Sequence, residues 1–495
     1  MIRQLITLAG SAAALLSLPL EAQQGARSPL TAYGSVRVRY EGWSWFDPGG
    51  AAPTVAGANS YGYGAALLKG GLRYDTRRWF DATLEFQNST FLGLPEDARG
   101  PAPIGEMGAG ASHFAPHLKS DDTRLFLNQG FITLKQPGRG ATYLRLGRFD
   151  YLDGAEAPTT DATLEWLRRS RVAGRLIANF GFSHVQRTFD GASAGLDGKR
   201  TNFTHLAAHP RQGGFELDGW KSMTEVDIAA ATVTFKPAWF GGRGEARLFA
   251  MYYGDRRSAD DSVFKVDSRP SAVRVADSAD IAMPMIGGHY LRHGALGRGQ
   301  WDATLWAVLQ GGSWGALDHR AWAVALEGGY QFAALPWKPW LRAGYNRSSG
   351  DNDPSDGTHQ TFFQALTTVR PFAQFPLYNL MNNEDLFAQL ILRPVPGRLT
   401  LRSDLHVVRL ANENDLWYGG SGAFQRRGSF GFGGRPSGGE RALATVADLT
   451  VDVTVRPWWN IYGYLAHAWG GAVVRGIYAG DGATLGYLEM TLRRP

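Results

Sequence analysis

The segment ADLTVDVTVR, residues 447–456, alternates apolar and polar side chains over ten positions. Alanine, leucine and valine occupy every second position, and aspartate, threonine and arginine lie between them. Residues 80–87 and 398–407 repeat this pattern. Because successive side chains of a strand point to opposite faces, each segment predicts a β-strand with one apolar face and one charged face.

Two classes of protein use such strands. In a water-soluble sandwich the apolar faces pack together, whereas in an outer-membrane barrel the apolar face meets lipid and the polar face lines the lumen. Ten residues is also about the length that a tilted strand needs to cross a bilayer. The alternation alone leaves both classes open.

The connections between the strands favour the barrel. Short turns marked by Pro or Gly alternate along the chain with long stretches rich in Gly and Asp. The short turns are residues 75–78, 136–140, 237–244, 334–339, 394–397 and 457–458. The long stretches are residues 88–123, 191–224, 254–283, 346–383 and 410–443. This alternation places short turns at one rim and long loops at the other, as in barrels with periplasmic turns and extracellular loops.

The pattern predicts an all-β fold, a single transmembrane antiparallel β-barrel of about 18 strands. The expected strands begin near Ser35, Tyr61, Trp79, Arg124, Ala141, Leu164, Phe180, Val226, Glu245, Pro284, Gly299, Arg320, Trp340, Glu384, Arg398, Ala444, Trp459 and Thr484. Aromatic residues near strand ends predict girdles at the membrane interfaces, with ordinary packing inside the barrel as the alternative. They include Trp43, Trp45, Trp79, Trp340, Trp458 and Tyr462.

The N-terminus predicts a secretory signal peptide over residues 1–22, followed by the barrel over residues 23–495. Arg3 precedes an almost continuously apolar run, and Ala22 supplies a small residue at the cleavage site. Beyond this segment no stretch reaches the 18 consecutive apolar residues expected of a spanning helix. Together with the strand pattern, this indicates a protein of the cell outer membrane.

Composition narrows the chemistry further. The chain has no Cys, which excludes a disulfide framework, a cysteine zinc site and a cysteine nucleophile. Its net charge is +6, and only 8 of its 51 basic residues are lysine. Arginine offers a planar fork suited to carboxylate and phosphate, although codon bias would give the same excess.

If the apolar face of each strand meets lipid, the residues on the opposite face lie in the lumen, and these include a set of basic side chains. The predicted pore-lining residues are Arg37, Arg39, Lys69, Arg73, Arg145, Arg148, Arg247, Arg342 and Arg402, and of these Arg148 lies outside clean alternation. A basic track of this kind would raise the local concentration of anions. Alternatively, these cations pair with inward carboxylates in structural networks, for which the candidates are Asp81, Glu85, Asp302, Asp404 and Asp452.

Other motifs carry little chemistry. The acidic stretch of residues 349–357 lacks the spacing of an EF-hand and is typical of local Asx turns, with a calcium site as the alternative. Three histidine pairs share a spacing of four, yet no third ligand is evident. No nucleophile elbow, P-loop or dinucleotide fingerprint occurs in a suitable context. The sequence therefore predicts a protein that is not an enzyme and holds no cofactor or metal.

Several segments resemble the alginate export proteins of the bacterial outer membrane. They are SVRVRYEGWSWF (35–46), LRLGRFDYLDG (144–154), GFSHVQRTFDG (181–191), AGYNRSSGDNDPSDGTHQTFF (343–363), YNLMNNEDLF (378–387) and DLHVVRLANENDLWYGGSGAF (404–424). The resemblance implies an 18-stranded barrel whose arginine-rich lumen passes an anionic polysaccharide. The C-terminus departs from many such barrels because it ends on Arg493, Arg494 and Pro495 rather than on an aromatic residue.

The leading interpretation is an outer-membrane channel that exports an anionic, alginate-like polysaccharide. The alternative is a general or uptake porin for small solutes. The expected partners are outer-membrane lipid, an anionic polysaccharide or small anions, and periplasmic secretion components, with no nucleic acid.

Overall fold

The computed structural model describes residues 29–49, 55–76, 78–136, 141–257, 265–420 and 432–494. The predicted signal peptide, residues 1–22, lies outside the described residues and stays a prediction. Within those ranges, no helix combines the length and the apolar character needed to cross a membrane.

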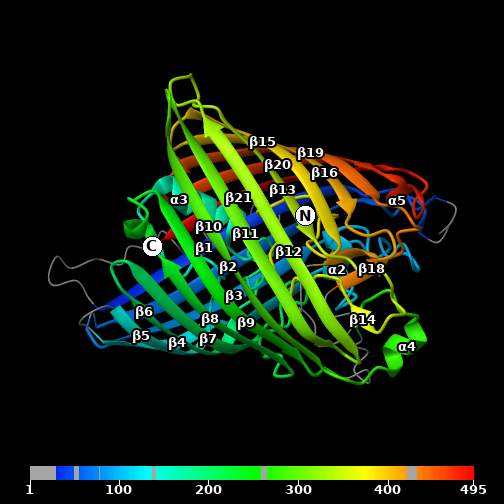
Figure 1. Ribbon diagram of the computed structural model, residues 1–495, viewed down its shortest axis with the longest axis horizontal. Coiled ribbons are helices and arrows are strands. Elements are labelled where there is room, and N and C mark those ends of the chain that lie inside the picture. The colour runs from blue at the N-terminus through cyan, green and yellow to red at the C-terminus, as the bar shows by residue number, and fades with distance from the viewer. Residues whose placement is uncertain are drawn as a thin grey trace.

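Eighteen antiparallel strands form a closed barrel (Figure 1). Each strand pairs with its neighbours along the chain, and β1 pairs with β21 from Gly34 opposite Arg494 to Ser44 opposite Thr484. This last pairing removes the open edges of the sheet. The predicted fold is therefore confirmed.

The wall is made of long strands with short turns at one rim. Its strands are β1 (Leu30–Ser44), β2 (Ser60–Asp75), β3 (Phe80–Leu92), β4 (Asp122–Gln136), β5 (Ala141–Phe149), β6 (Phe189–Asp197), β7 (Thr201–Pro210), β8 (Val226–Phe235), β9 (Gly244–Asp255), β10 (Ile281–Leu296), β11 (Gly299–Trp314), β12 (Leu317–Gln331), β13 (Trp340–Ser348), β15 (Asn383–Val395), β16 (Leu399–Leu410), β19 (Ala442–Arg456), β20 (Trp459–Gly470) and β21 (Gly482–Arg494).

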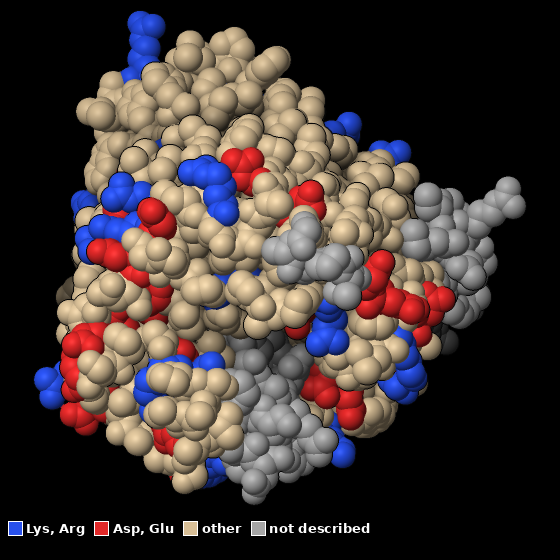
Figure 2. All heavy atoms as spheres, turned by 90° about the vertical axis from the view of Figure 1, so that its right-hand side faces the viewer, with Lys and Arg blue, Asp and Glu red and all other residues tan. Residues whose placement is uncertain are grey.

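The connections carry the remaining elements. These are α2 (Ala109–Phe114), α3 (Ala162–Leu167), the π-helix η3 (Arg168–Val172), the 3-10 turn η4 (Pro237–Trp239), α4 (Ser271–Ala276), β14 (Thr358–His359), β17 (Trp417–Gly420), β18 (Phe432–Arg435) and α5 (Ala472–Arg475). Strand β14 pairs in parallel with the start of β12, and β17 pairs with β18. Figure 2 views the end that carries most of the long loops, where basic and acidic side chains are intermixed. The face seen there therefore shows no uniform charge.

Side chains alternate across the wall as the sequence predicts. On β16, Leu405 and Val407 are exposed on the outer face, while Asp404 and His406 are buried on the inner face. Because the outer face of such a barrel meets hydrocarbon, the apolar side chains stay outside and the polar side chains turn inward.

Two of the strand predictions are wrong. No strand begins near Leu164 or Phe180, and strands β6 and β7 instead lie largely within residues 191–224, which were expected to form a long loop. Asp161 explains the first error, because its carboxylate accepts hydrogen bonds from the backbone N–H groups of Thr163 and Leu164 and starts helix α3. Strand β6 is rich in Gly and Ala, so its alternation is faint.

The alternation of short and long connections also has an exception. Strands β11 and β12 are joined at the long-loop rim by residues 315–316 alone. Gly315 has a positive φ of 62°, which suits this tight turn because glycine has no Cβ to clash.

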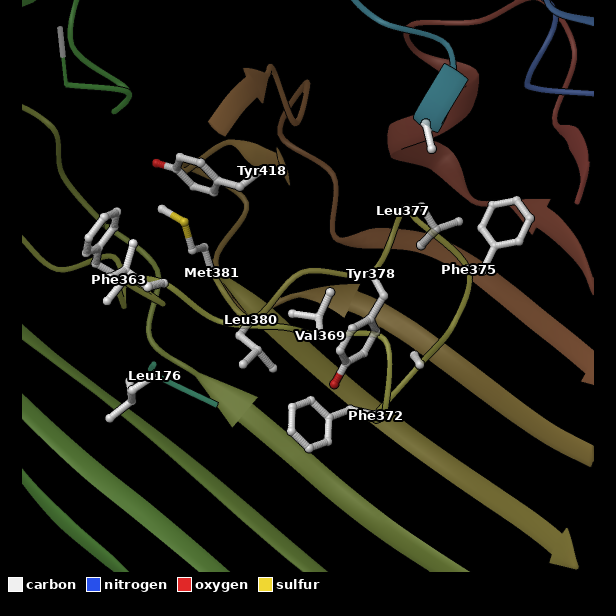
Figure 3. Close-up of a cluster of buried hydrophobic side chains, with 14 of the residues drawn as sticks. Leu176, Phe363, Val369, Phe372, Phe375, Leu377, Tyr378, Leu380, Met381 and Tyr418 are labelled. Carbon is white, nitrogen blue, oxygen red and sulfur yellow. The ribbon is translucent and has the colours of Figure 1, made fainter. Parts of the chain in front are cut away.

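Two long connections fold into the barrel. We call residues 150–188 the β5–β6 loop and residues 349–382 the β13–β15 loop. A parallel bridge pairs Ile177 with Leu366, and the N–H of Leu366 donates to the carbonyl oxygen of Leu176 at 2.8 Å. Around this bridge the loops bury a hydrophobic cluster that includes Phe363, Phe372 and Leu380 (Figure 3).

Part of the predicted aromatic girdle lies inside the barrel. Trp79 and Trp458 are exposed, whereas Trp43, Trp45 and Trp340 are buried. The indole N–H of Trp340 donates to Asp302 at 2.7 Å on the inner face of the wall. An amphipathic ring with one polar atom suits the interior of the barrel as well as it suits a membrane interface. A position near a strand end therefore does not show which of these two locations an aromatic residue occupies.

Candidate functional site

A cavity of about 340 Å³ lies where the two inward loops meet the inner face of the wall. It is lined by Arg37, Arg39, Leu152, Arg169, Ala173, Asn179, Gly181, Phe182, Thr368, Arg370, Pro371, Gln374, Arg402, Tyr462, Tyr487 and Glu489. Five of these residues are arginines, and Glu489 is the one carboxylate among them. The cavity is therefore strongly basic.

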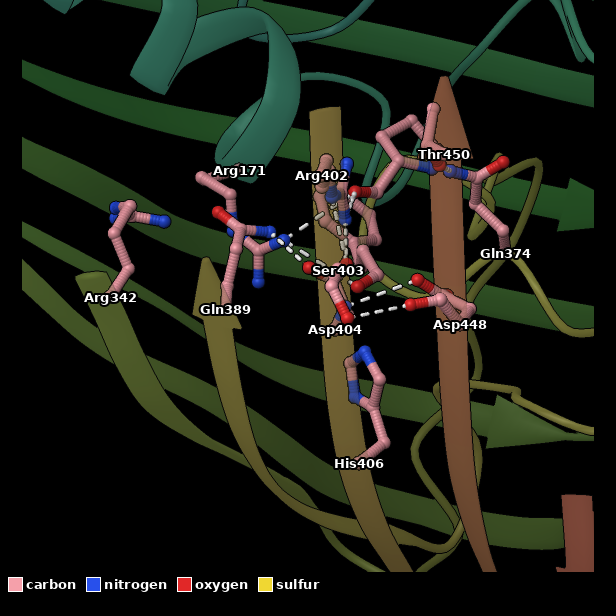
Figure 4. A network of polar contacts seen from close by, with 12 residues as sticks. Arg171, Arg342, Gln374, Gln389, Arg402, Ser403, Asp404, His406, Asp448 and Thr450 are labelled. Atoms are coloured by element: carbon pink, nitrogen blue, oxygen red, sulfur yellow. Dashed lines mark hydrogen bonds and ion pairs between the residues drawn. The ribbon is translucent and has the colours of Figure 1, made fainter. Parts of the chain in front are cut away.

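Two of the wall arginines in the cavity are paired with carboxylates. Arg39 on β1 contacts Glu41 at 2.9 Å and Glu489 at 2.6 Å. Arg402 on β16 pairs with Asp404, the second residue after it on the same face (Figure 4). These pairs lower the net charge of the wall beside the cavity but leave its cations in place.

The third wall arginine holds the β5–β6 loop. Arg37 donates to the carbonyl oxygens of Gly181 at 2.7 Å and Ser183 at 2.6 Å, and its Nε lies 3.7 Å from Glu489. Its guanidinium therefore forms part of the cavity and also fixes the loop segment that closes it.

The two loops supply the remaining two arginines. Arg169 follows helix α3 and pairs with Glu165, with its side chain largely exposed. Arg370 is buried in the β13–β15 loop, and its Nη1 donates to the carbonyl oxygen of Gln374. Burial lowers the pKa of Arg370 from its ordinary value, and an arginine remains charged after such a shift.

Aromatic rings complete the lining. The guanidinium of Arg39 lies 4.2 Å from the ring centre of Phe182 and 4.6 Å from that of Tyr487. The rings of Tyr462 and Tyr487 are stacked with their centres 5.9 Å apart. Phenol hydroxyls and flat ring faces beside cations suit a ligand that carries both hydroxyl groups and negative charge.

The amide of Gln374 ties the β13–β15 loop to these tyrosines. It donates to the hydroxyls of Tyr462 at 3.0 Å and Thr450 at 3.1 Å, and its oxygen accepts from Tyr487 at 2.9 Å. Figure 4 shows Gln374 reaching toward Thr450 on β19. On this side of the cavity, neutral hydrogen bonds therefore attach the β13–β15 loop to the barrel wall.

Of the nine predicted pore-lining residues, Arg37, Arg39 and Arg402 line the cavity. Three other arginines of the set are engaged with carboxylates elsewhere. Arg148 makes two hydrogen bonds to Asp190, at 2.6 and 2.7 Å. Arg247 contacts Asp153 and Glu156, and Arg342 contacts Asp302 and Glu327. For these three residues, the contacts match the alternative interpretation, in which inward cations pair with inward carboxylates in structural networks.

The last three predicted residues differ from one another. Lys69 lies 3.6 Å from Glu85, and Arg73 is exposed near the short-turn rim. Arg145 stacks over Phe131 at 4.7 Å and donates to Thr133 at 3.3 Å. Its neighbours Leu144 and Leu146 are exposed on the outer face, so Arg145 lies on the inner face outside the cavity.

Sequence reasoning missed Phe182, Arg370, Gln374, Tyr487 and Glu489, and it assigned Tyr462 to the girdle. Tyr487 and Glu489 lie on the inner face of β21, where the alternation of side chains along strands applies. Phe182, Arg370 and Gln374 lie on loops that turn inward, and the same alternation carries no information about such loops. A signal was nevertheless available, because residues 361–381 are rich in Phe, Leu and other large apolar residues. A loop exposed to water would not be expected to carry so many, so this composition indicates a buried segment.

The acidic stretch makes local turns. The carboxylate of Asp353 accepts from the N–H and hydroxyl of Ser355, and that of Asp356 accepts from the N–H of Thr358 at 2.7 Å. Within the described residues, no group of three or more His, Cys, Asp or Glu side chains is arranged to hold a metal ion.

Comparison with known proteins identifies the family. The family model for alginate export matches residues 96–482. No curated protein is detectably similar in sequence.

Solved outer-membrane porins share the fold. OccK9 (OpdG) of Pseudomonas aeruginosa is 12% identical, with a TM-score of 0.56 and coverage of 94% of this chain and 98% of that chain. OccK2 (OpdF) of Pseudomonas aeruginosa, solved in complex with glucuronate, is 10% identical, with a TM-score of 0.54 and coverage of 94% and 96%. A BenF-like porin from Pseudomonas fluorescens Pf-5 is 10% identical, with a TM-score of 0.55 and coverage of 94% and 98%. The chain belongs to the alginate export family and is an outer-membrane β-barrel channel.

Proposed function

We propose that the channel passes carboxylated saccharides and exports an anionic, alginate-like polysaccharide. The observation that carries this proposal is the cavity between the two inward loops, where five arginines and several aromatic rings surround one carboxylate. Its volume of about 340 Å³ lies at the small end of the range for ligand pockets, so it would accept a short segment of an extended chain.

Weak contacts suit passage of a polymer. A polyuronate carries one carboxylate on every sugar, and partly hydrated ion pairs are individually worth only about 0–1 kcal/mol. Each sugar would therefore be attracted to the cavity without being held there. Several contacts acting together would still favour the polymer over a single ion.

An uptake porin for small acidic solutes is the second candidate. The volume of the cavity supports it, because a single uronate would also fit. The similarity of fold to a porin solved with glucuronate supports it as well, although the sequence identity of 10% carries the fold and not the ligand. Both candidates share selection for a carboxylated sugar.

Planar-bilayer recordings of the purified protein test this shared selection. We expect anion selectivity in a salt gradient, weaker at high salt because screening shortens the range of the arginine field. Glucuronate should reduce the chloride current, and glucose at the same concentration should leave it nearly unchanged. Equal effects of the two sugars, or cation selectivity, would contradict the proposal.

A further inference from the structure

The five cavity arginines differ in how their charge is compensated. Arg39, Arg169 and Arg402 each pair with a carboxylate, and Arg37 lies 3.7 Å from Glu489. Among the residues that the structure describes, none of the ion pairs includes Arg370. Its guanidinium donates to the carbonyl oxygen of Gln374 and stacks on the ring of Phe182, and the Glu41 carboxylate, which pairs with Arg39, interacts with it without forming an ion pair.

The packing of Arg370 leaves its edge for a ligand. Its guanidinium carbon lies 4.4 Å from the ring centre of Phe182, the same ring that Arg39 contacts at 4.2 Å. Stacking covers a face of the planar group and leaves the N–H groups at its edge, which are the groups that bind a carboxylate. The Nε of Arg370 is buried and has no hydrogen-bond partner.

The loop holds Arg370 in a fixed position. The N–H of Thr368 donates to the carbonyl oxygen of Gly174 at 3.0 Å, which joins the loop to its neighbour just before Arg370. Just after it, Gln374 accepts from the guanidinium through its backbone and reaches Tyr462 and Tyr487 through its side chain. A guanidinium held in place from both sides is prepared for a ligand before that ligand arrives.

From these contacts we infer that Arg370 is the specificity-determining residue of the channel, the group that binds the carboxylate of a saccharide in the cavity. This inference rests on the proposed selection for carboxylated sugars. Arg37, Arg39 and Arg402 supply the surrounding field, while Arg370 makes the direct contact. The selecting residue thus belongs to a loop and not to the barrel wall.

The test measures glucuronate block of the full-length protein in planar bilayers. Arg370→Gln should raise the half-blocking concentration of glucuronate by about tenfold or more, the loss expected for one charge-assisted contact. Arg145→Gln is the matched control, because it removes one stacked arginine from the inner face outside the cavity. It should change the half-blocking concentration by less than about threefold, the effect of a screened charge at a distance.

A second pair of variants covers the case in which Arg370→Gln does not fold. Arg370→Lys keeps the charge but cannot stack on Phe182 and present a planar fork at once. It should still weaken glucuronate block, whereas Arg145→Lys should not.

The outcomes separate this inference from the proposed function. If glucuronate fails to block the unmodified channel, both are overturned. If glucuronate blocks the unmodified channel but the substitutions at Arg370 act no more strongly than the matching substitutions at Arg145, the inference about Arg370 alone is overturned.

Discussion

The two loops that meet inside the barrel are attached to the wall in different ways. In the β5–β6 loop, Arg168 contacts Glu245 at 3.3 Å, and Arg171 contacts Glu327 at 2.5 Å. An ion pair with the opposite polarity also forms, because Arg247 of the wall contacts Glu156 of the loop at 2.7 Å. In the β13–β15 loop, the contacts that Gln374 makes to the wall are neutral hydrogen bonds, and the Arg402 guanidinium adds one long contact of 3.5 Å to the carbonyl oxygen of Pro371.

This difference assigns the loops different mechanical roles. Breaking a buried ion pair leaves a buried charge without its partner, whereas breaking a neutral hydrogen bond costs about 0.5–1.5 kcal/mol net. We therefore expect the β5–β6 loop to stay attached to the wall under conditions that loosen the β13–β15 loop. Ala365 and Asn382 lie in the buried part of that loop with positive φ angles of 47° and 48°, a conformation that costs Ala more than Asn.

The largest expected effect comes from removing the carboxylate that anchors the fixed loop. Glu327 contacts Arg171, Arg175 and Arg342, and all four side chains are buried. Glu327→Ala leaves three buried cations without this partner and should lower the free energy of unfolding by about 3–5 kcal/mol. Urea unfolding in detergent, followed by tryptophan fluorescence, measures the change.

Glu384 provides the control for that substitution. It pairs with Arg409 and Arg441, whose side chains are 49% and 35% exposed. Glu384→Ala should cost less than about 1 kcal/mol, because exposed ion pairs contribute little. Similar losses in the two variants would remove the distinction between a charged, fixed loop and a neutral, movable one.

A smaller effect is expected from the neutral attachment. Gln374→Ala removes the hydrogen bonds to Thr450, Tyr462 and Tyr487 and should weaken docking of the β13–β15 loop by about 1–3 kcal/mol. Unfolding of the barrel should hardly change, but single-channel recordings should show larger current fluctuations.

Gln389→Ala is the control, since that amide joins β15 to Asp404 on β16 within the wall. It should leave the current fluctuations as they are. If the current fluctuations of Gln374→Ala are no larger than those of Gln389→Ala, the β13–β15 loop is not the part that loosens first.

The smallest effect concerns the outer end of the β13–β15 loop. Burial, with a contribution from the nearby Asp415 carboxylate, raises the pKa of Asp351 to about 6. The folded protein therefore holds this proton more tightly than the unfolded chain does. The stability that it contributes is complete below the ordinary pKa of an aspartate and is lost as the pH rises through about 6.

Asp351→Asn should remove this dependence. Thermal unfolding in detergent should match the unmodified protein at pH 4 and show a gain of less than about 1 kcal/mol at pH 7.5, because solvent screens the group in part. Asp353→Asn, in the exposed turn beside it, should show no such gain. A loss of stability in Asp351→Asn at pH 7.5 would show that the ionised carboxylate is favourable.

The sequence predicts the wall well because lipid and lumen impose opposite demands on alternate residues. Leu405 and Asp404 show this directly, since one is exposed on the outer face and the other is buried on the inner face. The prediction fails where that contrast fades, as in the Gly- and Ala-rich strand β6. Sixteen of the predicted strands have counterparts at the expected places, and the two failed predictions, near Leu164 and Phe180, fall within the β5–β6 loop.

The site was harder to predict than the wall. The alternation of inward and outward side chains along a strand identifies Arg37, Arg39 and Arg402, because these residues lie on strands. It cannot find Arg370 or Phe182, whose positions depend on two loops that are distant in sequence and meet at Ile177 and Leu366. It also cannot tell that Arg148, Arg247 and Arg342 are held by carboxylates, because pairing depends on rotamers and on partners from other elements.

Export of an anionic polysaccharide is tested most directly by the length dependence of channel block by charged and neutral oligosaccharides. We expect oligouronates to block the unmodified channel more strongly as they lengthen and less strongly as salt is raised, because several weak contacts act together and each is screened. Neutral oligosaccharides of the same length should block weakly. If charged and neutral oligomers block equally, or if block by uronates does not depend on length, export of an anionic polysaccharide is contradicted and a general porin remains.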